Sequence, residues 1–96
     1  MISSFADQTT ADIYDGLDTK PARRIPRPIW NVAQRKLDMI EATHQLADLR
    51  VPRGNRLETL KGRLTGYYSI RINDQFRLVF RWADGVANHV LITDYH

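Results

Sequence analysis

The side chains best suited to chemistry in this chain are basic, and they gather in one stretch. Residues 49–81 carry eight basic side chains against only two acidic ones, Glu58 and Asp74. The eight are Arg50, Arg53, Arg56, Lys61, Arg63, Arg71, Arg77 and Arg81. A planar guanidinium binds two phosphate oxygens at once, so the stretch predicts a surface for RNA, DNA or an acidic protein. The same arginines could instead form an ordinary solvated face.

Other kinds of site chemistry are limited by composition. Cysteine is absent, which excludes disulfides, thiolate metal sites and thiol nucleophiles. The three histidines, His44, His89 and His96, are too scattered for a metal motif, so we expect neither a metal nor another cofactor. We assign His44 and His89 to structure. His96 is left as an imidazole that can both give and accept a proton near neutral pH.

Length and composition set the frame for this chemistry. A chain of 96 residues with 43% hydrophobic and 26% charged residues predicts one globular domain over residues 1–96. Its apolar runs are too short to cross a membrane, and the first ten residues lack the basic start and apolar stretch of an export signal. We therefore expect a cytoplasmic protein that does not enter a membrane.

The first half of the chain predicts a strand followed by helices. Residues 1–5 alternate in hydropathy, and residues 11–17 fit one or two helical turns. Residues 20–28 hold three of the four prolines and form a stiff basic connection. Apolar positions recurring every three or four residues predict an amphipathic helix over about 28–44, with His44 on its apolar face. A short helical piece at 45–49 follows.

The second half changes to the two-residue period of strands. Alternation predicts strands at 67–72, 76–82 and 88–95, and the Asp84-Gly85 pair favours a tight hairpin between the last two. The sequence thus predicts a small α+β fold, with an N-terminal strand and helices packed on a C-terminal antiparallel β-meander. Arg71, Arg77 and Arg81 have the opposite parity from the large apolar residues of their strands, so we expect them on the open face of the sheet.

Three motifs in this order resemble a known toxin family. They are Leu-x-x-Leu-Lys-Gly at 57–62, a Gly-x-x-Ser-Ile-Arg-x-Asn-x-x-x-Arg pattern over 66–77, and a terminal Asp-Tyr-His. Together they resemble the HigB-type toxins of the RelE superfamily, and the resemblance extends over nearly the whole chain. It implies the RelE-like fold and a ribosome-dependent endoribonuclease that cleaves messenger RNA in the decoding (A) site. It also implies a cognate helix-turn-helix antitoxin, through which the complex binds operator DNA.

The resemblance also assigns roles to individual residues. The family's functional positions fall on Lys61, Arg77, Asp94, Tyr95 and His96 of this chain. Where some members carry a histidine between the two leucines, this chain has Glu58. That carboxylate could serve as the base, or it could be a surface residue paired with a nearby arginine. Arg56, Arg71 and Arg81 are expected to bind the nucleic acid.

The proposed chemistry is consistent with these residue types. RNA cleavage without a metal ion needs a base for the 2′-hydroxyl proton, cations for the phosphorane and an acid for the leaving 5′-oxygen. Lys61 and Arg77 are the cations, Glu58 or Asp94 could take the proton, and His96 could transfer one in either direction. Tyr95 could stack on a base or donate its hydroxyl.

Two other functions are compatible with the same fold class. A toxin of the ParE type poisons DNA gyrase without chemistry and would not need the set of cations, acid and imidazole. A plain RNA-binding module would need only the basic face, and its terminal histidine would be incidental.

Overall fold

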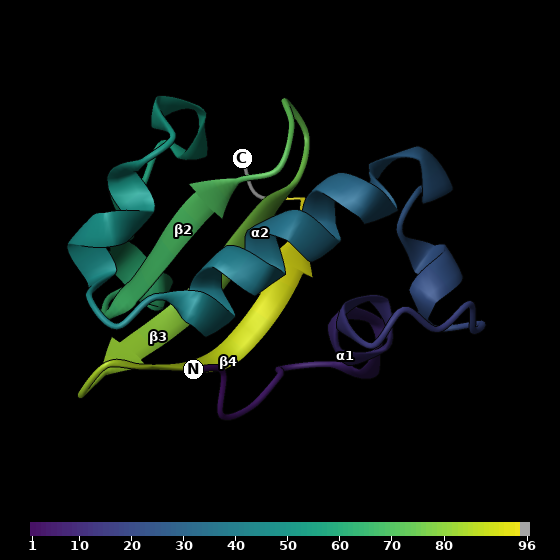
Figure 1. Ribbon diagram of the computed structural model, residues 1–96, viewed down its shortest axis with the longest axis horizontal. Helices are drawn as coiled ribbons and strands as arrows, with labels where there is room; N and C mark the ends of the chain where they lie inside the picture. The colour runs from purple at the N-terminus through teal and green to yellow at the C-terminus, as the bar shows by residue number, and fades with distance from the viewer. Residues whose placement is uncertain (95–96) are drawn as a thin grey trace.

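The sheet and the helix on it give the chain its architecture. The computed structural model describes residues 1–94 and confirms the α+β class. Its antiparallel sheet has the order β1-β2-β3-β4, and two α-helices precede it in the chain. The elements are α1 Gln8–Tyr14, α2 Trp30–Ala42, β1 Glu58–Thr59, β2 Tyr67–Arg71, β3 Arg77–Ala83 and β4 Val86–Thr93. Figure 1 shows α2 lying across one face of the sheet.

The expected long helix is present but shorter at both ends. A 3₁₀ turn at Arg27–Ile29 leads into α2, which ends at Ala42. Thr43 is extended (ψ 144°), and its hydroxyl donates to the Gln45 carbonyl at 2.9 Å. This local bond offers the chain an alternative to another helical turn. The placement of His44 on the helix's apolar face was therefore wrong, because His44 lies beyond α2 and is exposed.

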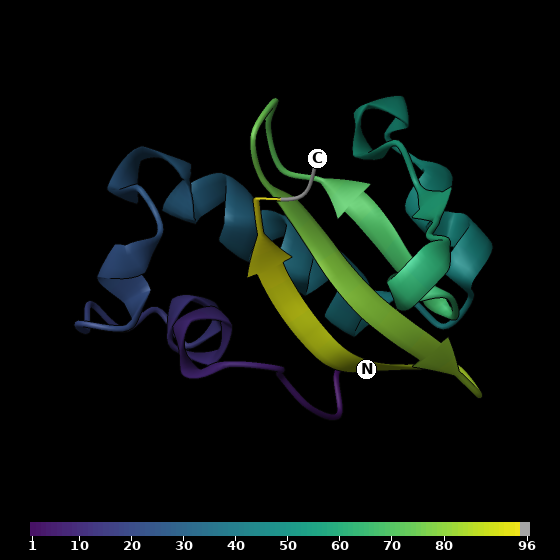
Figure 2. The same cartoon turned by 180° about the vertical axis from the view of Figure 1, so that it is seen from behind.

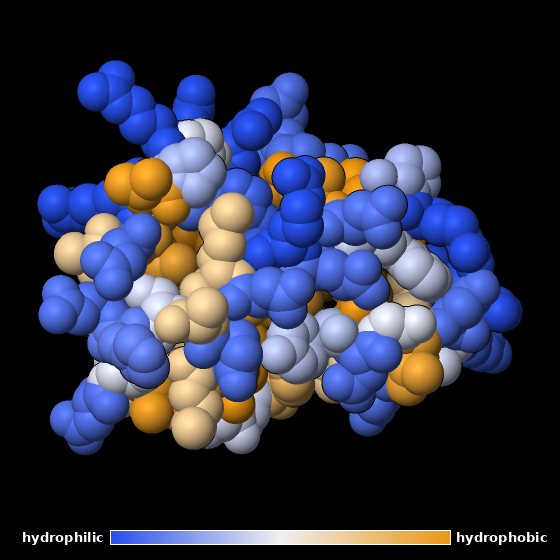
Figure 3. All heavy atoms as spheres, viewed as in Figure 1, coloured by the Kyte–Doolittle hydropathy of each residue, from blue (hydrophilic) through white to orange (hydrophobic). Residues whose placement is uncertain are grey.

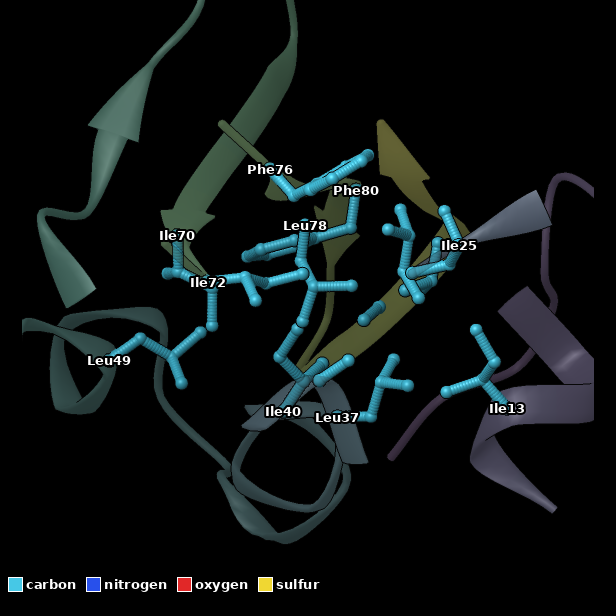
Figure 4. Packing of buried hydrophobic residues seen from close by; sticks show 14 of the residues in the cluster. Ile13, Ile25, Leu37, Ile40, Leu49, Ile70, Ile72, Phe76, Leu78 and Phe80 are labelled. Carbon is cyan, nitrogen blue, oxygen red and sulfur yellow. The ribbon is translucent and has the colours of Figure 1, made fainter. Parts of the chain in front are cut away.

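The core lies between α2 and the near face of the sheet. Figure 4 shows Leu37 and Ile40 of α2 pointing toward Leu78 and Phe80 of β3. All four side chains are fully buried. Truncating a buried leucine or isoleucine to alanine typically costs about 2–5 kcal/mol. This packing fixes the sheet against α2 and so positions the side chains on its other face.

The N-terminal segment and α1 lie along the β4 edge of the sheet. Residues 1–5 pair with β4 through isolated parallel bridges, Ile2 to Ala87 and Phe5 to Val90, rather than as a continuous strand. The proline-containing connection folds into two 3₁₀ turns, Ala22–Arg24 and Arg27–Ile29. It also contributes Ala22 to the core. No helix within residues 1–94 combines the length and the apolar character needed to span a bilayer.

The three expected strands are confirmed with small shifts, and one strand is added. β4 begins at Val86 rather than residue 88, because Asp84 (φ 53°) and Gly85 (φ 78°) alone make the hairpin turn. The two-residue β1 was not predicted. It joins the sheet by pairing Glu58 with Ser69 and Thr59 with Tyr68.

The two faces of the molecule differ. On the α2 side, hydrophilic side chains cover most of the surface and apolar patches are scattered among them (Figure 3). Figure 2 shows the other side, where neither α-helix covers β2, β3 and β4. We call this the arginine face, after Arg71, Arg77 and Arg81.

Candidate active site on the arginine face

The register of the sheet confirms that the three strand arginines share a face. Arg71 of β2 lies opposite Arg77 of β3, and Tyr67 lies opposite Arg81. The face is less open than expected. Ser69 and Val79, which lie opposite each other at its centre, are buried. The middle of the face is therefore closed to solvent, and its exposed polar side chains lie around that centre.

Arg77 is the most firmly held cation of this face. Its Nε donates to the Ser69 hydroxyl at 2.9 Å, and its Nη2 donates to the Arg56 carbonyl at 2.7 Å. Its side chain is only 13% exposed. Two hydrogen bonds from one planar guanidinium fix its orientation. Arg77 is thus a preorganised positive group rather than a mobile surface cation.

Glu58 lies beside this guanidinium. It stands opposite Ser69 in the β1–β2 pairing, and its Oε2 lies 3.9 Å from Arg77 Nη2. The carboxylate is 55% exposed, so a substrate could reach it. The structure therefore shows the pairing with an arginine, made by a carboxylate that remains more than half exposed.

Arg56 contributes its backbone to the site. It adopts the left-handed conformation (φ 46°), which presents its carbonyl to Arg77, while its own side chain is exposed. The preceding residue, Asn55, is fully buried and holds this loop. Its side-chain amide donates to the Leu49 carbonyl at 3.1 Å, and its oxygen accepts from Lys36 of α2.

Lys61 lies toward the other end of the sheet. The Leu60 N–H donates to the Tyr67 carbonyl at 2.9 Å, and Tyr67 is the strand partner of Arg81. Lys61 follows Leu60 directly, so its backbone lies one residue beyond the level of Arg81, about 16 Å along the strand from Arg77. It is exposed, and no acid within residues 1–94 forms an ion pair with it.

The other two nucleic-acid candidates differ in availability. Arg71 forms an ion pair with Asp74, which neutralises part of its charge. Arg81 is exposed and lies over the Tyr67 ring, with 5.5 Å between guanidinium carbon and ring centroid. A cation stacked in this way keeps its N–H groups for other partners. We therefore expect Arg81 to bind phosphate more strongly than Arg71.

Asp94, the last described residue, lies at the same end of the sheet as Arg77. Arg77 lies opposite Thr93, and Asp94 follows directly. Asp94 accepts a hydrogen bond from Gln75 Nε2 at 3.1 Å, which ties it to the loop between β2 and β3. Tyr95 and His96 lie outside the described residues. Within residues 1–94, no cluster of histidine, aspartate and glutamate side chains could hold a metal ion.

Sequence reasoning missed two buried polar residues of the site. Ser69 was recognisable by parity, because it shares the face of Arg71, but its bond to Arg77 depends on the register between strands. Asn55 had no signal beyond being a turn-forming residue. His89 was assigned to structure, yet it is exposed and lines a pocket together with Arg81.

Comparison with known proteins gives the class to which this chain belongs. The model of the HigB-like toxin family, described as the RelE-like toxin of the type II toxin–antitoxin system HigB, matches residues 3–96. Toxin HigB-1 of Vibrio cholerae is 46% identical over 87 residues, which cover 91% of this chain and 90% of that toxin. The chain belongs to the HigB family of type II toxin–antitoxin toxins.

A second protein sequence and a solved structure are also similar to this chain. An uncharacterised protein of Haemophilus influenzae is 39% identical over 88 residues, covering 92% of this chain and 85% of that protein. Among solved structures, the heterotetrameric YoeB–YefM toxin–antitoxin complex of Staphylococcus aureus contains a chain of similar fold. Its TM-score is 0.54 at 21% identity, with 100% of this chain and 98% of that chain covered. This last similarity supports the fold alone.

Proposed function

We propose that this toxin is a ribosome-dependent endoribonuclease that cleaves messenger RNA in the decoding site by acid–base chemistry without a metal ion. The observation that carries the proposal is the held guanidinium of Arg77, which lies 3.9 Å from the Glu58 carboxylate. A fixed cation beside a group that can take a proton is what an attack on a phosphodiester requires. Membership of the HigB family supports the same reaction.

The proposed step transfers two protons and exchanges one P–O bond. A base, Glu58 or Asp94, takes the proton of the 2′-hydroxyl, whose oxygen then attacks the adjacent phosphorus. Arg77 stabilises the negative charge that accumulates on the phosphorane. Lys61 adds its charge from farther along the sheet, where its flexible four-carbon stem lets the ammonium approach the bound strand. His96 protonates the 5′-oxygen as it leaves. The products are a 2′,3′-cyclic phosphate and a 5′-hydroxyl end. Tyr95 stacks on a base or donates its hydroxyl.

The remaining arginines hold the RNA strand. We assign phosphate contacts to Arg56 and Arg81, with a weaker one to Arg71 because Asp74 already pairs with it. Such a small set of cations is not sufficient to organise free RNA, so we propose that the ribosome presents the message in the required conformation.

Family membership supports a proposal for the cellular setting. We propose that the toxin works in the cytoplasm and is neutralised by a cognate antitoxin with a helix-turn-helix domain. The toxin–antitoxin complex would bind operator DNA through the antitoxin. The solved YoeB–YefM complexes, in which a chain of similar fold is bound to its antitoxin, are consistent with an antitoxin partner.

Mapping messenger ends after incubation with translating ribosomes tests the proposal. The parent should give cuts within codons at the decoding site, and Arg77→Ala should give far fewer cuts in the same time. Efficient cutting of naked messenger at the same enzyme concentration would contradict the dependence on the ribosome. Absence of any cut, together with stabilised gyrase–DNA cleavage complexes, would instead favour a ParE-type toxin. RNA binding without cleavage would favour a plain binding module.

A further inference from the structure

A pocket opens at the end of the sheet that is remote from Asp94. Its volume is about 470 Å³, within the usual range of small-molecule sites, roughly 300–1,000 Å³. It lies where β2 begins and where the β3–β4 hairpin closes. Its lining includes Gly66, Tyr68, Arg81, Trp82, Asn88 and His89. None of the assigned acid–base residues lines it, so it is separate from the cleavage centre.

A β-bulge shapes one wall of this pocket. Val79 pairs with Leu91 and Arg81 pairs with Asn88, so Phe80 alone faces two residues of β4, His89 and Val90. His89 takes the left-handed conformation (φ 54°) and is exposed, while Val90 is buried. A β-bulge redirects a side chain at the cost of local strain. Here it allows the imidazole to line the pocket.

The N-terminal segment fixes this bulge in place. The His89 N–H donates to the Ser4 hydroxyl at 2.9 Å, and the Asn88 side-chain oxygen accepts from the Ser3 hydroxyl. With its oxygen engaged, Asn88 keeps its amide N–H groups for another partner. The pocket wall is therefore held by the fold and does not depend on a ligand to form it.

Arg81 connects the pocket to the arginine face. It lines the pocket, stacks over Tyr67 and pairs with no acid among residues 1–94. It also lies on the same strand and face as Arg77, four residues or about 13 Å away. A single RNA strand in extended form could therefore contact both arginines.

We propose that this pocket binds a nucleotide of the RNA strand that flanks the cleaved bond, an inference that rests on the proposed function. Arg81 supplies a cation for the phosphate. Trp82 and Tyr68 supply aromatic surface for a base, and Asn88 and His89 supply groups that can hydrogen-bond its edge. Aromatic surface combined with an unpaired arginine is the usual means of holding single-stranded RNA.

The test compares two glycine variants with the parent. His89→Gly removes the imidazole from the pocket, and its matched control, Asp84→Gly, changes another exposed residue with left-handed backbone (φ 53°) that does not line the pocket. Glycine adopts this conformation without strain, so we expect both variants to fold with unfolding midpoints at or above that of the parent.

Binding is measured by fluorescence anisotropy with a labelled 2′-O-methyl hexaribonucleotide, which cannot be cleaved, at low ionic strength without ribosomes. His89→Gly should raise the Kd at least fivefold, and Asp84→Gly should leave it unchanged or lower. Adenosine 5′-phosphate should compete better than ribose 5-phosphate. A Kd for His89→Gly within twofold of the parent, or equal competition by the two phosphates, would overturn the proposal. The proposal would also be overturned if His89→Gly lost antitoxin binding but kept the parent's affinity for the oligonucleotide.

The same samples separate this proposal from the proposed function. If the parent cuts no messenger on ribosomes and His89→Gly still loses oligonucleotide binding, the pocket is supported as a nucleotide site and the endoribonuclease activity is refuted. If the parent cuts messenger and His89→Gly binds the oligonucleotide as well as the parent does, the endoribonuclease is supported and the nucleotide pocket is refuted.

Discussion

Ser69 offers the sharpest test of how Arg77 works. Its hydroxyl is fully buried and accepts the Arg77 Nε–H at 2.9 Å. Replacing Ser69 by alanine removes that acceptor while leaving the strand backbone intact. Hydrogen bonds to charged groups contribute about 1.5–3 kcal/mol. Part of this loss should appear as reduced stability, and part as a less ordered guanidinium.

The effect on catalysis should be smaller than that of removing the cation itself. Arg77→Ala should cost about 2–4 kcal/mol of transition-state stabilisation. In Ser69→Ala the Arg56 carbonyl still accepts from Nη2 at 2.7 Å, so we expect a loss of about 1 kcal/mol, roughly fivefold in rate. Ser69→Thr keeps the hydroxyl and suits a strand, and it should retain most of the activity.

A double-mutant cycle distinguishes positioning from general damage. Single-turnover cleavage on programmed ribosomes is measured for the parent, both single variants and the double variant, and urea unfolding is measured on the same samples. If Ser69 acts through Arg77, Ser69→Ala should slow cleavage in the parent and have no effect in the Arg77→Ala background. Equal slowing in both backgrounds would refute the positioning role.

Four further predictions concern other parts of the chain. Lys61→Ala should lower single-turnover cleavage by about 2–4 kcal/mol with unchanged unfolding, and a rate within threefold of the parent would exclude Lys61 as a stabilising cation. Deleting His96 should cost cleavage far more than stability, because a terminal residue contributes little packing; normal cleavage by a folded deletion would remove it from the mechanism. Replacing Arg56 or Arg81 should lower the salt dependence of single-stranded RNA binding by about 0.7 per lost contact, and replacing Arg71 should lower it less, since Asp74 already pairs with it; equal changes in all three would contradict this ranking. Hydrogen bonds from Thr19 and Gln8 lower the pKa of Asp12, so the stability that ionised Asp12 contributes should be present above the usual aspartate range and lost as pH falls through the lowered value. Asp12→Asn should therefore make the free energy of unfolding depend less on pH in that acid range. An unchanged pH profile would show that Asp12 does not cause this dependence.

The sequence predicted the parts of the fold that rest on periodicity. The two-residue alternation placed Arg71, Arg77 and Arg81 on one face, and the sheet register confirms this. The three-to-four-residue period found α2. Its end was misplaced because an extended Thr43, bonded to the Gln45 carbonyl, stops the helix before His44.

Features that break a period were not predictable in the same way. β1 is only two residues long, too short to show alternation. The bulge at His89 inserts one residue into the pairing, so parity counted from either end of the strand gives a different face. The bond between Ser69 and Arg77 joins diagonal neighbours on two strands. Predicting this hydrogen bond requires the register between β2 and β3, whereas alternation within each strand gives only the face on which a residue lies.

The distribution of the site along the sheet gives a physical reason for the proposed dependence on the ribosome. Arg77 and Asp94 lie near one end, and Glu58 reaches Arg77 from the middle of the sheet, level with Val79. Arg81 and Lys61 lie four and about five residues along the strands from Arg77, roughly 13–17 Å away. An RNA strand contacts both groups only if it is extended, and free single strands must lose conformational entropy to become so. A message already held in the decoding site has lost that freedom before the toxin binds. The same toxin contacts should therefore lead to cleavage on the ribosome and to weak, unproductive binding in solution.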